Sequence, residues 1–276
     1  MKLMIGGTRG SISGGNQHFN KYGGDTSSYL VESSNRDQIL VDLGTGVRNL
    51  LPYLNGETTD RELLVLLSHF HLDHLYGLVL LPQLHTIKKK ITILSQSHYG
   101  LNVEQAVDNL INPPYWPLGI QAMSSKILFG NLDEGSNDLE RGDLTVRWDR
   151  QNHPGNSTVF RIEERQTGKS VVIATDVEWQ ASNKTEKDVL LDISRGCDLL
   201  VMDGQFCENE YPAFIGWGHS TLKDAAEVGQ KAGVKQILVT HHAPMRSDDE
   251  LDAAWAEAGL DDYPVRLARQ GEIVEI

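Results

Sequence analysis

Short apolar runs that each end at a polar residue recur along this chain of 276 residues. Runs of that length are typical of buried strands. Five of them are 39–41 before Asp42, 63–67 before Ser68, 171–174 before Thr175, 199–202 before Asp203 and 237–239 before Thr240. Because loops that leave strands present functional groups on a rigid scaffold, we expect the polar ends of these strands to converge on one site.

Helical patterns lie between some of the strands. Residues 221–232 open with the Thr-x-x-Asp spacing of a capping box and are predicted to form a helix. Residues 249–258 are a second predicted helix, which Gly259 ends. Residues 72–84 are a third candidate, which Pro82 interrupts.

No internal repeat, low-complexity stretch or linker divides the chain, so we expect a single domain over residues 1–276. The least regular part is an insert at about 112–138, which contains the segment Pro113-Pro114-Tyr115-Trp116-Pro117. A long irregular insert is typical of a lid or a pocket wall, and a plain surface excursion is the alternative.

Composition narrows the class of protein. Hydrophobic residues make up 39% of the chain, enough for a sizeable core, but no stretch approaches the about 20 apolar residues of a membrane span. The N-terminus lacks the apolar region of a secretory signal. Cys197 and Cys207 are the two cysteines, so neither a disulfide framework nor a cysteine-based zinc site is expected. These features predict a cytoplasmic protein with no membrane partner.

The formal net charge of −13 argues against a protein that grips long stretches of nucleic acid, because phosphate contacts require lysine and arginine. The longest basic run, Lys88-Lys89-Lys90, is predicted to be the solvated start of a strand. A divalent metal site would still attract a small anionic substrate locally.

The strongest local signal is the run His69-Phe70-His71-Leu72-Asp73-His74, directly after a predicted strand. Neutral imidazole and carboxylate groups are ligands for divalent ions such as Zn²⁺. His69 and His71 alternate, so both side chains can point the same way from an extended loop. Since the whole chain holds only 10 histidines, a metal site is a better explanation than a loop that is rich in histidine by chance.

A site for two metals needs about seven ligands, one of them a bridging carboxylate. Candidates for the remaining three are His153, Asp176 and His241. Each is a weak candidate alone, because a single histidine is more often a surface or core residue and an aspartate can simply form a turn. Their shared position just past a predicted strand makes all three stronger candidates for metal ligands. His242, next to His241, is the second choice for the last ligand.

In order along the chain, these residues resemble the pattern of the metallo-β-lactamase superfamily of metal-dependent hydrolases, over nearly the whole chain. The resemblance implies an α/β fold, the αβ/βα four-layer sandwich, in which two mixed β-sheets are flanked by helices. It implies two divalent metal ions, with Zn²⁺ expected and Mn²⁺ or Fe²⁺ also suited. It assigns His69, His71 and His153 to one metal and Asp73, His74 and His241 to the other, with Asp176 between them.

The resemblance also implies roles. Two metals share a water whose pKa falls toward neutrality, which gives a hydroxide nucleophile. The family places its last ligand directly after a strand that ends in Leu-x-Thr, which selects His241 over His242. Asp42 is a candidate to orient a ligand from behind. Glycines near the N-terminus do not match a phosphate-binding loop, and we interpret them as tight turns beneath the metals.

Two further segments resemble the phosphodiesterase branch of the superfamily, which includes tRNase Z and small-molecule cyclic and ribosyl phosphodiesterases. They are Gly218-His219-Ser220-Thr221 and the run that ends at Asp203. By resemblance His219 contacts the phosphate and donates a proton to the leaving oxygen, and Asp203 hydrogen-bonds it. The N-terminus of the following helix is expected to add backbone amides for the phosphate. His219, Asp203 and the ligand Asp73 are therefore the predicted catalytic residues, and a mere helix-cap neighbour is the alternative for His219.

Asp203 stands where tRNase Z-like proteins typically have glutamate, so its shorter side chain predicts a looser contact with His219. Only 23 residues separate His153 from Asp176, which leaves no room for the protruding arm of long-arm tRNase Z. A small phosphodiester of the cyclic-nucleotide kind is therefore favoured as substrate over nucleic acid. A homodimer is expected from the resemblance alone.

Alternatives stay open. A tRNA 3′-processing endonuclease could use the same site without the arm, and a carboxyl-ester, lactone or thioester hydrolase of this fold would not need His219. A redox diiron module is disfavoured because its second histidine is usually glutamate, whereas His71 stands here. A non-catalytic metal-binding protein is the last alternative. Tyr115, Trp116 and Trp217 are candidates to stack on a base, with core packing as their commoner role.

Overall fold

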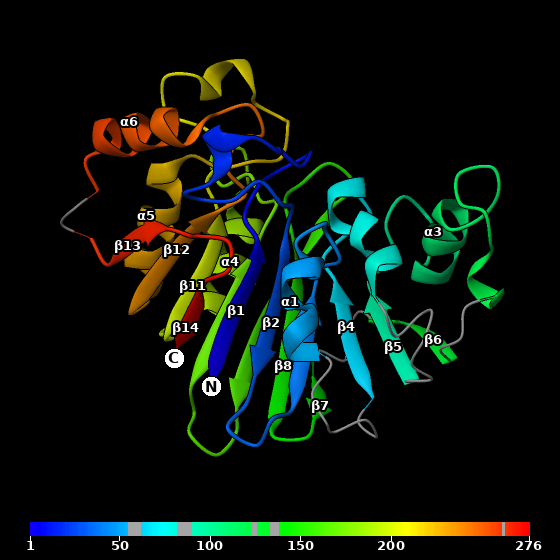
Figure 1. Cartoon of the computed structure of the whole chain (residues 1–276). Helices are drawn as coiled ribbons and strands as arrows, with labels where there is room; N and C mark the ends of the chain where they lie inside the picture. The colour runs from blue at the N-terminus through cyan, green and yellow to red at the C-terminus, as the bar shows by residue number, and fades with distance from the viewer. Residues whose placement is uncertain (55–61, 82–89, 123–125, 133–137, 261–262) are drawn as a thin grey trace.

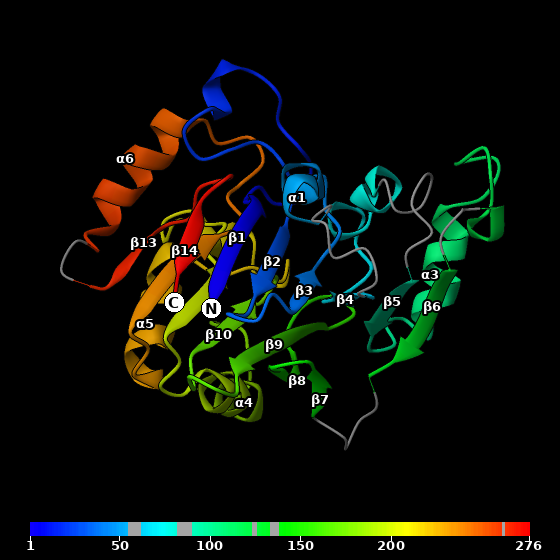
Figure 2. The same ribbon diagram turned by 60° about the horizontal axis from the view of Figure 1, so that its bottom comes forward.

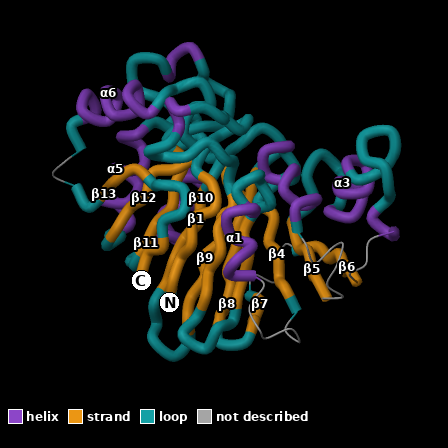
Figure 3. Tube along the Cα trace, viewed as in Figure 1, coloured by secondary structure: helices purple, strands orange, loops and turns teal. Residues whose placement is uncertain are grey.

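The chain forms two seven-stranded β-sheets that pack face to face, with helices on their outer faces (Figures 1 and 3). The structure is a computed structural model, and it describes residues 1–54, 62–81, 90–122, 126–132, 138–260 and 263–276. Each sheet contains both parallel and antiparallel pairs. This arrangement confirms the predicted αβ/βα sandwich of two mixed sheets flanked by helices.

The first sheet has the order β14-β1-β2-β3-β4-β5-β6. Its strands are β1 Lys2–Gly7, β2 Ser28–Glu32, β3 Gln38–Val41, β4 Leu63–Leu67, β5 Lys90–Ser95, β6 Lys126–Asn131 and β14 Ile273–Glu275. The strands from β3 to β6 run parallel. Since β1 pairs with β14, the two ends of the chain lie side by side (Figure 2).

The second sheet has the order β13-β12-β11-β10-β9-β8-β7. Its strands are β7 Leu139–Arg141, β8 Leu144–Gln151, β9 Ser157–Glu164, β10 Ser170–Ala174, β11 Leu199–Asp203, β12 Gln236–Thr240 and β13 Val265–Leu267. The strands from β10 to β13 run parallel. The five apolar runs of the sequence are therefore β3, β4, β10, β11 and β12, as predicted, and their carboxyl ends carry the polar residues.

Helices cover the outer face of each sheet. They are α1 Val47–Leu54, α3 Val103–Leu110, α4 Lys184–Ser194, α5 Leu222–Ala232 and α6 Asp248–Ala258, with 3₁₀ turns η1 Gln17–Phe19, η2 Leu72–His74, η3 Tyr76–Leu80, η4 Ile120–Ala122 and η5 Tyr211–Ala213. Helix α1 packs on β1 and β2, α3 on β5 and β6, α4 on β8 and β9, and α5 on β11 and β12. Figure 2 shows α3 and α4 on opposite sides of the molecule.

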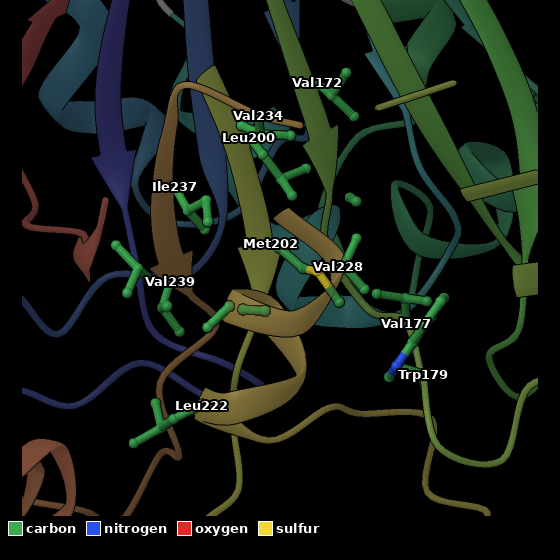
Figure 4. Close-up of a cluster of buried hydrophobic side chains, with 14 of the residues drawn as sticks. Val172, Val177, Trp179, Leu200, Met202, Leu222, Val228, Val234, Ile237 and Val239 are labelled. Atoms are coloured by element: carbon green, nitrogen blue, oxygen red, sulfur yellow. The ribbon is translucent and has the colours of Figure 1, made fainter. Parts of the chain in front are cut away.

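Apolar side chains fill three layers. The middle layer lies between the sheets, where Val41 and Leu66 of the first sheet belong to one buried cluster with Ile173 and Val201 of the second. An outer layer joins the second sheet to α4, α5 and α6 (Figure 4), and another joins the first sheet to α1, η3 and α3. Burying both faces of the parallel strands explains why they are continuous apolar runs rather than alternating ones.

The helix predictions have mixed outcomes. Thr221 caps α5 with a complete capping box, and α6 ends at Gly259, whose φ of 65° is left-handed, so both helices are confirmed. The continuous helix predicted over 72–84 is wrong. Its described part forms η2 and η3 instead, and Gly77 donates its backbone N–H to Leu43 O rather than to a carbonyl one helical turn earlier. Residues 82–84 lie outside the described residues.

Two further predictions fall partly outside the described residues. Lys88 and Lys89 are not described, and Lys90 is the exposed first residue of β5. Within the predicted insert at 112–138, residues 126–131 form the edge strand β6, whereas 123–125 and 133–137 are not described. No helix among the described residues has the length and hydrophobicity that spanning a membrane requires.

A buried arginine ties the N-terminal loop to the loop after β12. The Arg9 guanidinium is shielded from solvent and donates hydrogen bonds to the carbonyl oxygens of Gly23, Ala243 and Arg246 at 2.9–3.1 Å. Burial lowers the pKa of Arg9 to about 10, while Asp248 at 3.8 Å opposes that shift. Both loops contribute to the site described below, so Arg9 sets their relative position.

Replacing this arginine by methionine tests its structural role. In Arg9→Met the buried carbonyl group of Gly23 and the partly buried ones of Ala243 and Arg246 lose a charged donor, so we expect the free energy of unfolding to fall by about 3 kcal/mol. Urea denaturation measures it. Arg266→Met, which removes a solvent-exposed pair with Glu272, is the matched control and should cost about 0.5 kcal/mol or less. Equal losses in the two variants would contradict the assigned role.

Candidate metal centre

The loops that follow β4 in the first sheet and β8, β10 and β12 in the second place seven side chains in one cluster. The loop after β4 supplies His69, His71, Asp73 and His74, the loop after β8 supplies His153, and the residues after β10 and β12 supply Asp176 and His241. All seven predicted metal ligands are thus brought together. His71 is partly exposed, and the other six are buried.

The cluster divides into two groups that share Asp176. One group is His69, His71, His153 and Asp176, and the other is Asp73, His74, Asp176 and His241, with the candidate ligand atoms of each group within 4.8 Å of one another. Oδ1 of Asp176 lies 3.8 Å from Nε2 of both His69 and His153. Oδ2 lies 3.1 Å from His74 Nε2 and 3.3 Å from His241 Nδ1. Each carboxylate oxygen therefore faces one group.

Unsatisfied polar atoms test whether this cluster fits a cation. Nε2 of His69, His74 and His241 and Oδ2 of Asp176 are buried, and none of these atoms makes a hydrogen bond in the described structure. Such orphaned atoms are costly, and buried polar groups normally have partners. Their chemistry is the nitrogen and oxygen donor set of a divalent ion such as Zn²⁺. The residues present therefore fit the metal ions that the sequence predicts.

The electrostatics agree with ligation. Burial lowers the pKa of His69 well below its ordinary value and that of His153 to about 4, so both imidazoles stay neutral and keep a lone pair for a metal. Burial alone would raise the pKa of Asp176, but His241 and His74 outweigh it and hold that pKa well below its ordinary range. The bridging carboxylate is therefore ionised.

Asp42 orients the cluster from behind, as the sequence suggests. Its carboxylate accepts hydrogen bonds from the backbone N–H and hydroxyl of Ser68 at 2.8 and 2.9 Å and from His74 Nδ1 at 2.8 Å. The last contact fixes the tautomer of His74 and leaves its Nε2 for the metal. On the opposite side of the cluster, Gly218 O accepts from His153 Nδ1 at 2.8 Å.

Asp203 and His219 form a close pair, contrary to the expectation of a loose one. Asp203 Oδ2 lies 2.7 Å from His219 Nδ1. The shorter aspartate suffices because its other oxygen accepts backbone N–H groups from Gln205 and Ser220, which draws the His219 loop onto the end of β11. Burial would lower the pKa of His219, but Asp203 raises it to about 9. The His219 ring stacks on that of His241, with centroids 4.8 Å apart.

The expected phosphate contacts at the start of α5 are not present. The backbone N–H of Ser220 donates to Asp203, that of Thr221 to Asp224, and that of Leu222 to Phe206 O. Because these donors already have partners within the protein, the helix N-terminus has none to offer a phosphate there. The His219 side chain is the polar group that remains on this side of the cluster.

His242 points away from the cluster. Its Nε2 lies 3.0 Å from Ala268 O, and its ring packs edge-on against Tyr22. Burial lowers the pKa of His242 to about 3. The structure therefore places His241 with the metal ligands and His242 in the core. The predicted tight turns beneath the metals include Gly10, where a Cβ atom would lie 2.4 Å from the His241 ring.

Glu178 is a residue that the sequence does not reveal as part of the site. It is buried, and its carboxylate accepts hydrogen bonds from Tyr211 Oη at 2.8 Å and from the backbone N–H groups of Gly216 and Gly218 at 2.7 and 2.9 Å. Burial raises the pKa of Tyr211, and Glu178 raises it further. The only signal in the sequence is an acidic residue between Val177 and Trp179. Glu178 holds the loop that carries both the partner of His153 and His219 itself.

The aromatic candidates lie in different places. Trp217, two residues before His219, is 61% exposed and packs edge-to-face on Phe214. Tyr115 and Trp116 line an apolar cavity together with Phe70 and Leu72, which alternate with the metal-ligand candidates. Part of the predicted insert thus forms a cavity wall.

Comparison with known proteins agrees with this geometry. The family model described as "Beta-lactamase superfamily domain" matches residues 37–242. Ribonuclease Z of Brevibacillus brevis is 30% identical over 91 residues, which cover 33% of this chain and 26% of that protein. The uncharacterized protein Mb1374 of Mycobacterium bovis is 25% identical over 281 residues, covering 100% of this chain and 92% of the relative. The chain thus spans only about a quarter of the length of the ribonuclease Z that it matches.

Solved structures share the fold. The metallo-beta-lactamase fold protein YhfI from Bacillus subtilis has a TM-score of 0.72 at 22% identity, covering 100% of this chain and 98% of its own. The short form of human tRNase Z (ELAC1) has a TM-score of 0.71 at 18% identity, covering 100% and 99%. Yeast PDE1 has a TM-score of 0.68 at 15% identity, with the same coverages.

Removing the charge of Asp42 tests its orienting role. In Asp42→Asn the amide presents a donor to groups that are themselves donors, so we expect zinc affinity to fall about 10–100-fold. Competition with a chromogenic chelator measures it. Asp188→Asn, on the exposed face of α4, is the control and should bind zinc as the wild type does. Unchanged affinity in a folded Asp42→Asn protein would refute the role.

Glu178→Gln tests the buried clamp. One amide oxygen cannot accept from three donors, so we expect a loss of about 1–3 kcal/mol in the stability of this loop. Hydrogen exchange should then be faster across residues 214–219. Glu227→Gln, which removes a surface pair with Lys231 on α5, should leave that exchange unchanged. Equal protection in the two variants would show that the loop does not depend on Glu178.

Proposed function

The chain belongs to the metallo-β-lactamase superfamily of hydrolases, and from this premise we propose that it is a dinuclear-metal phosphodiesterase acting on small phosphodiesters of the cyclic-nucleotide kind. The observation that carries the proposal is the Asp203–His219 pair, whose imidazole stacks directly on the metal-ligand candidate His241. That position gives a phosphodiester two neighbours at once: the metal cluster on one side and a cationic proton donor on the other.

We assign separate roles to the residues of the site. When bound, a pair of divalent ions would supply an activated water and polarise the phosphoryl group whose phosphorus this water attacks. His69, His71 and His153 would hold one ion and Asp73, His74 and His241 the other, with Asp176 shared. His219 contacts a phosphoryl oxygen and donates its proton to the departing alkoxide, and Asp203 keeps the imidazole oriented for that transfer.

A second candidate function is tRNA 3′-end processing. Relatives named ribonuclease Z and the fold of human tRNase Z favour it. The segment between His153 and Asp176 speaks against it. There β9 and β10 are joined by the five residues 165–169, which leaves no room for a protruding arm. The net charge of −13 also disfavours a large polyanion.

Hydrolysis of bis(p-nitrophenyl) phosphate by zinc-loaded protein tests the proposal. We expect turnover, and His219→Ala should reduce kcat by about 100-fold or more because it removes the hydrogen-bond contact to a phosphoryl oxygen in the transition state. His18→Ala, at an exposed histidine of η1, is the matched control and should keep full activity. Hydrolysis of p-nitrophenyl acetate without any diesterase activity would reject the phosphodiesterase assignment in favour of an ester or thioester hydrolase.

The same preparation separates the two phosphodiester substrates. A cyclic nucleotide and a precursor tRNA with a 3′ trailer are compared by kcat/KM. A higher value for the cyclic nucleotide supports the proposal, and a higher value for the precursor tRNA assigns the site to tRNA processing instead.

A further inference from the structure

A cavity of about 580 Å³ lies beside the metal cluster, between the metal-binding loop and α3. One wall consists of Phe70, Leu72 and Tyr76, and the other contains Tyr115 and Trp116. Its volume is within the roughly 300–1,000 Å³ of ligand pockets in proteins. Both Figure 1 and Figure 2 show α3 beyond β4, on the opposite side of the first sheet from β13 and α6.

The cavity shares a wall with the metal centre. Phe70 and Leu72 alternate along the chain with His69, His71 and Asp73, so one short loop serves the cluster and the cavity. The Phe70 ring meets that of His98 at 4.9 Å, and the His98 ring lies 6.5 Å from that of His69. The cavity and the candidate ligands thus lie beside each other, on the two sides of one short loop.

The residues that line the cavity determine which chemical groups it can bind. None of the described residues that line the cavity is charged, and Asn109 carries the only side-chain amide among them. A charged or strongly polar group would lose its hydration there without finding enough partners. Aromatic rings, in contrast, pack favourably against the phenyl, phenol and indole groups present.

Exposure shows that this surface is left uncovered by the described chain. Tyr115 is 78% exposed, Tyr76 52% and Leu72 49%. Apolar side chains gathered at the mouth of a cavity mark a binding site more often than isolated ones do. Their position next to the metal loop makes the substrate, rather than a protein partner, the occupant.

We propose that this cavity binds an uncharged aromatic group of the substrate, one that carries few hydrogen-bonding atoms, while the phosphorus lies at the metal cluster. The placement of the phosphorus rests on the proposed function, whereas the aromatic chemistry of the cavity rests on its lining alone. The cavity thereby narrows the proposed substrate within the small phosphodiesters: it favours an aryl group over a small alkyl group and over the polar base of a cyclic nucleotide.

Calorimetric titration of the zinc-loaded protein with 2-naphthol tests the cavity without any catalytic step. We expect saturable binding of this neutral two-ring alcohol and weaker binding of adenosine, whose polar edges find few partners. The naphthol should also inhibit hydrolysis of bis(p-nitrophenyl) phosphate competitively. No saturable binding, or tighter binding of adenosine than of naphthol, would overturn the proposal.

Three variants locate the binding. Tyr115→Ala and Trp116→Ala should each weaken naphthol binding about tenfold, because each removes one aromatic wall. Ala106→Phe introduces a ring into the cavity from α3 and should abolish binding. Tyr263→Ala, an exposed tyrosine remote from the cavity, is the matched control and should bind as the wild type does. Undiminished binding by folded Ala106→Phe protein would place the naphthol elsewhere and refute the cavity.

The two proposals fail separately. A protein that hydrolyses bis(p-nitrophenyl) phosphate but does not bind naphthol keeps its phosphodiesterase assignment and loses the aromatic cavity. A protein that binds naphthol with the expected variant pattern but hydrolyses no diester keeps the cavity, and its metal centre then acts on another class of aryl compound.

Discussion

One buried carboxylate, that of Asp176, has its two oxygens turned toward two different sets of imidazoles. A charge this deeply buried is stable only with compensating positive charge around it. Within the described residues, histidines are the positive groups that act most strongly on Asp176, so the compensation comes from them or from cations that they hold. This requirement explains why side chains from four strand ends, one in the first sheet and three in the second, have to meet within a few ångströms.

Bringing these side chains together imposes backbone strain, and the packing of the apolar layers offsets that strain. Asp42, Asp176 and His241 all have φ between 56° and 59°, a left-handed conformation that is unfavourable for residues with a side chain. Each follows closely on a strand that is buried at its carboxyl end, and the apolar layers on both faces of these strands hold the strand ends in place. The cluster also depends on contacts behind it, such as Asp42 with His74 and Arg9 with the carbonyl groups of the adjoining loops.

How far the sequence predicts the molecule depends on the range of the interaction. The buried strands, α5 and α6 follow from local patterns, and the ligand-rich run from His69 to His74 is likewise visible locally. Glu178 is not, because its three donors come from a loop more than 30 residues further along the chain. The Asp203–His219 hydrogen bond was expected from the resemblance, but its closeness was not, because it depends on how the backbone after β11 turns. The amides at the start of α5 were assigned to phosphate because their partners inside the fold have no sequence signature.

The charge distribution of the protein favours different chemical groups at the two ends of one substrate. With a net charge of −13, the chain repels large polyanions. A pair of divalent ions would nevertheless create a local positive site, because salt screens charges that are far apart much more than charges in contact. The described residues that line the cavity beside it carry no charge, so binding there is stabilised mainly by the burial of apolar surface. A compact monoanion with an aromatic group satisfies both sites at once, whereas a nucleic acid would bring further phosphates toward an acidic surface. Our proposal of a small diester rather than a polymer rests on this combination of a candidate metal cluster, the His219 imidazole and a neutral aromatic cavity.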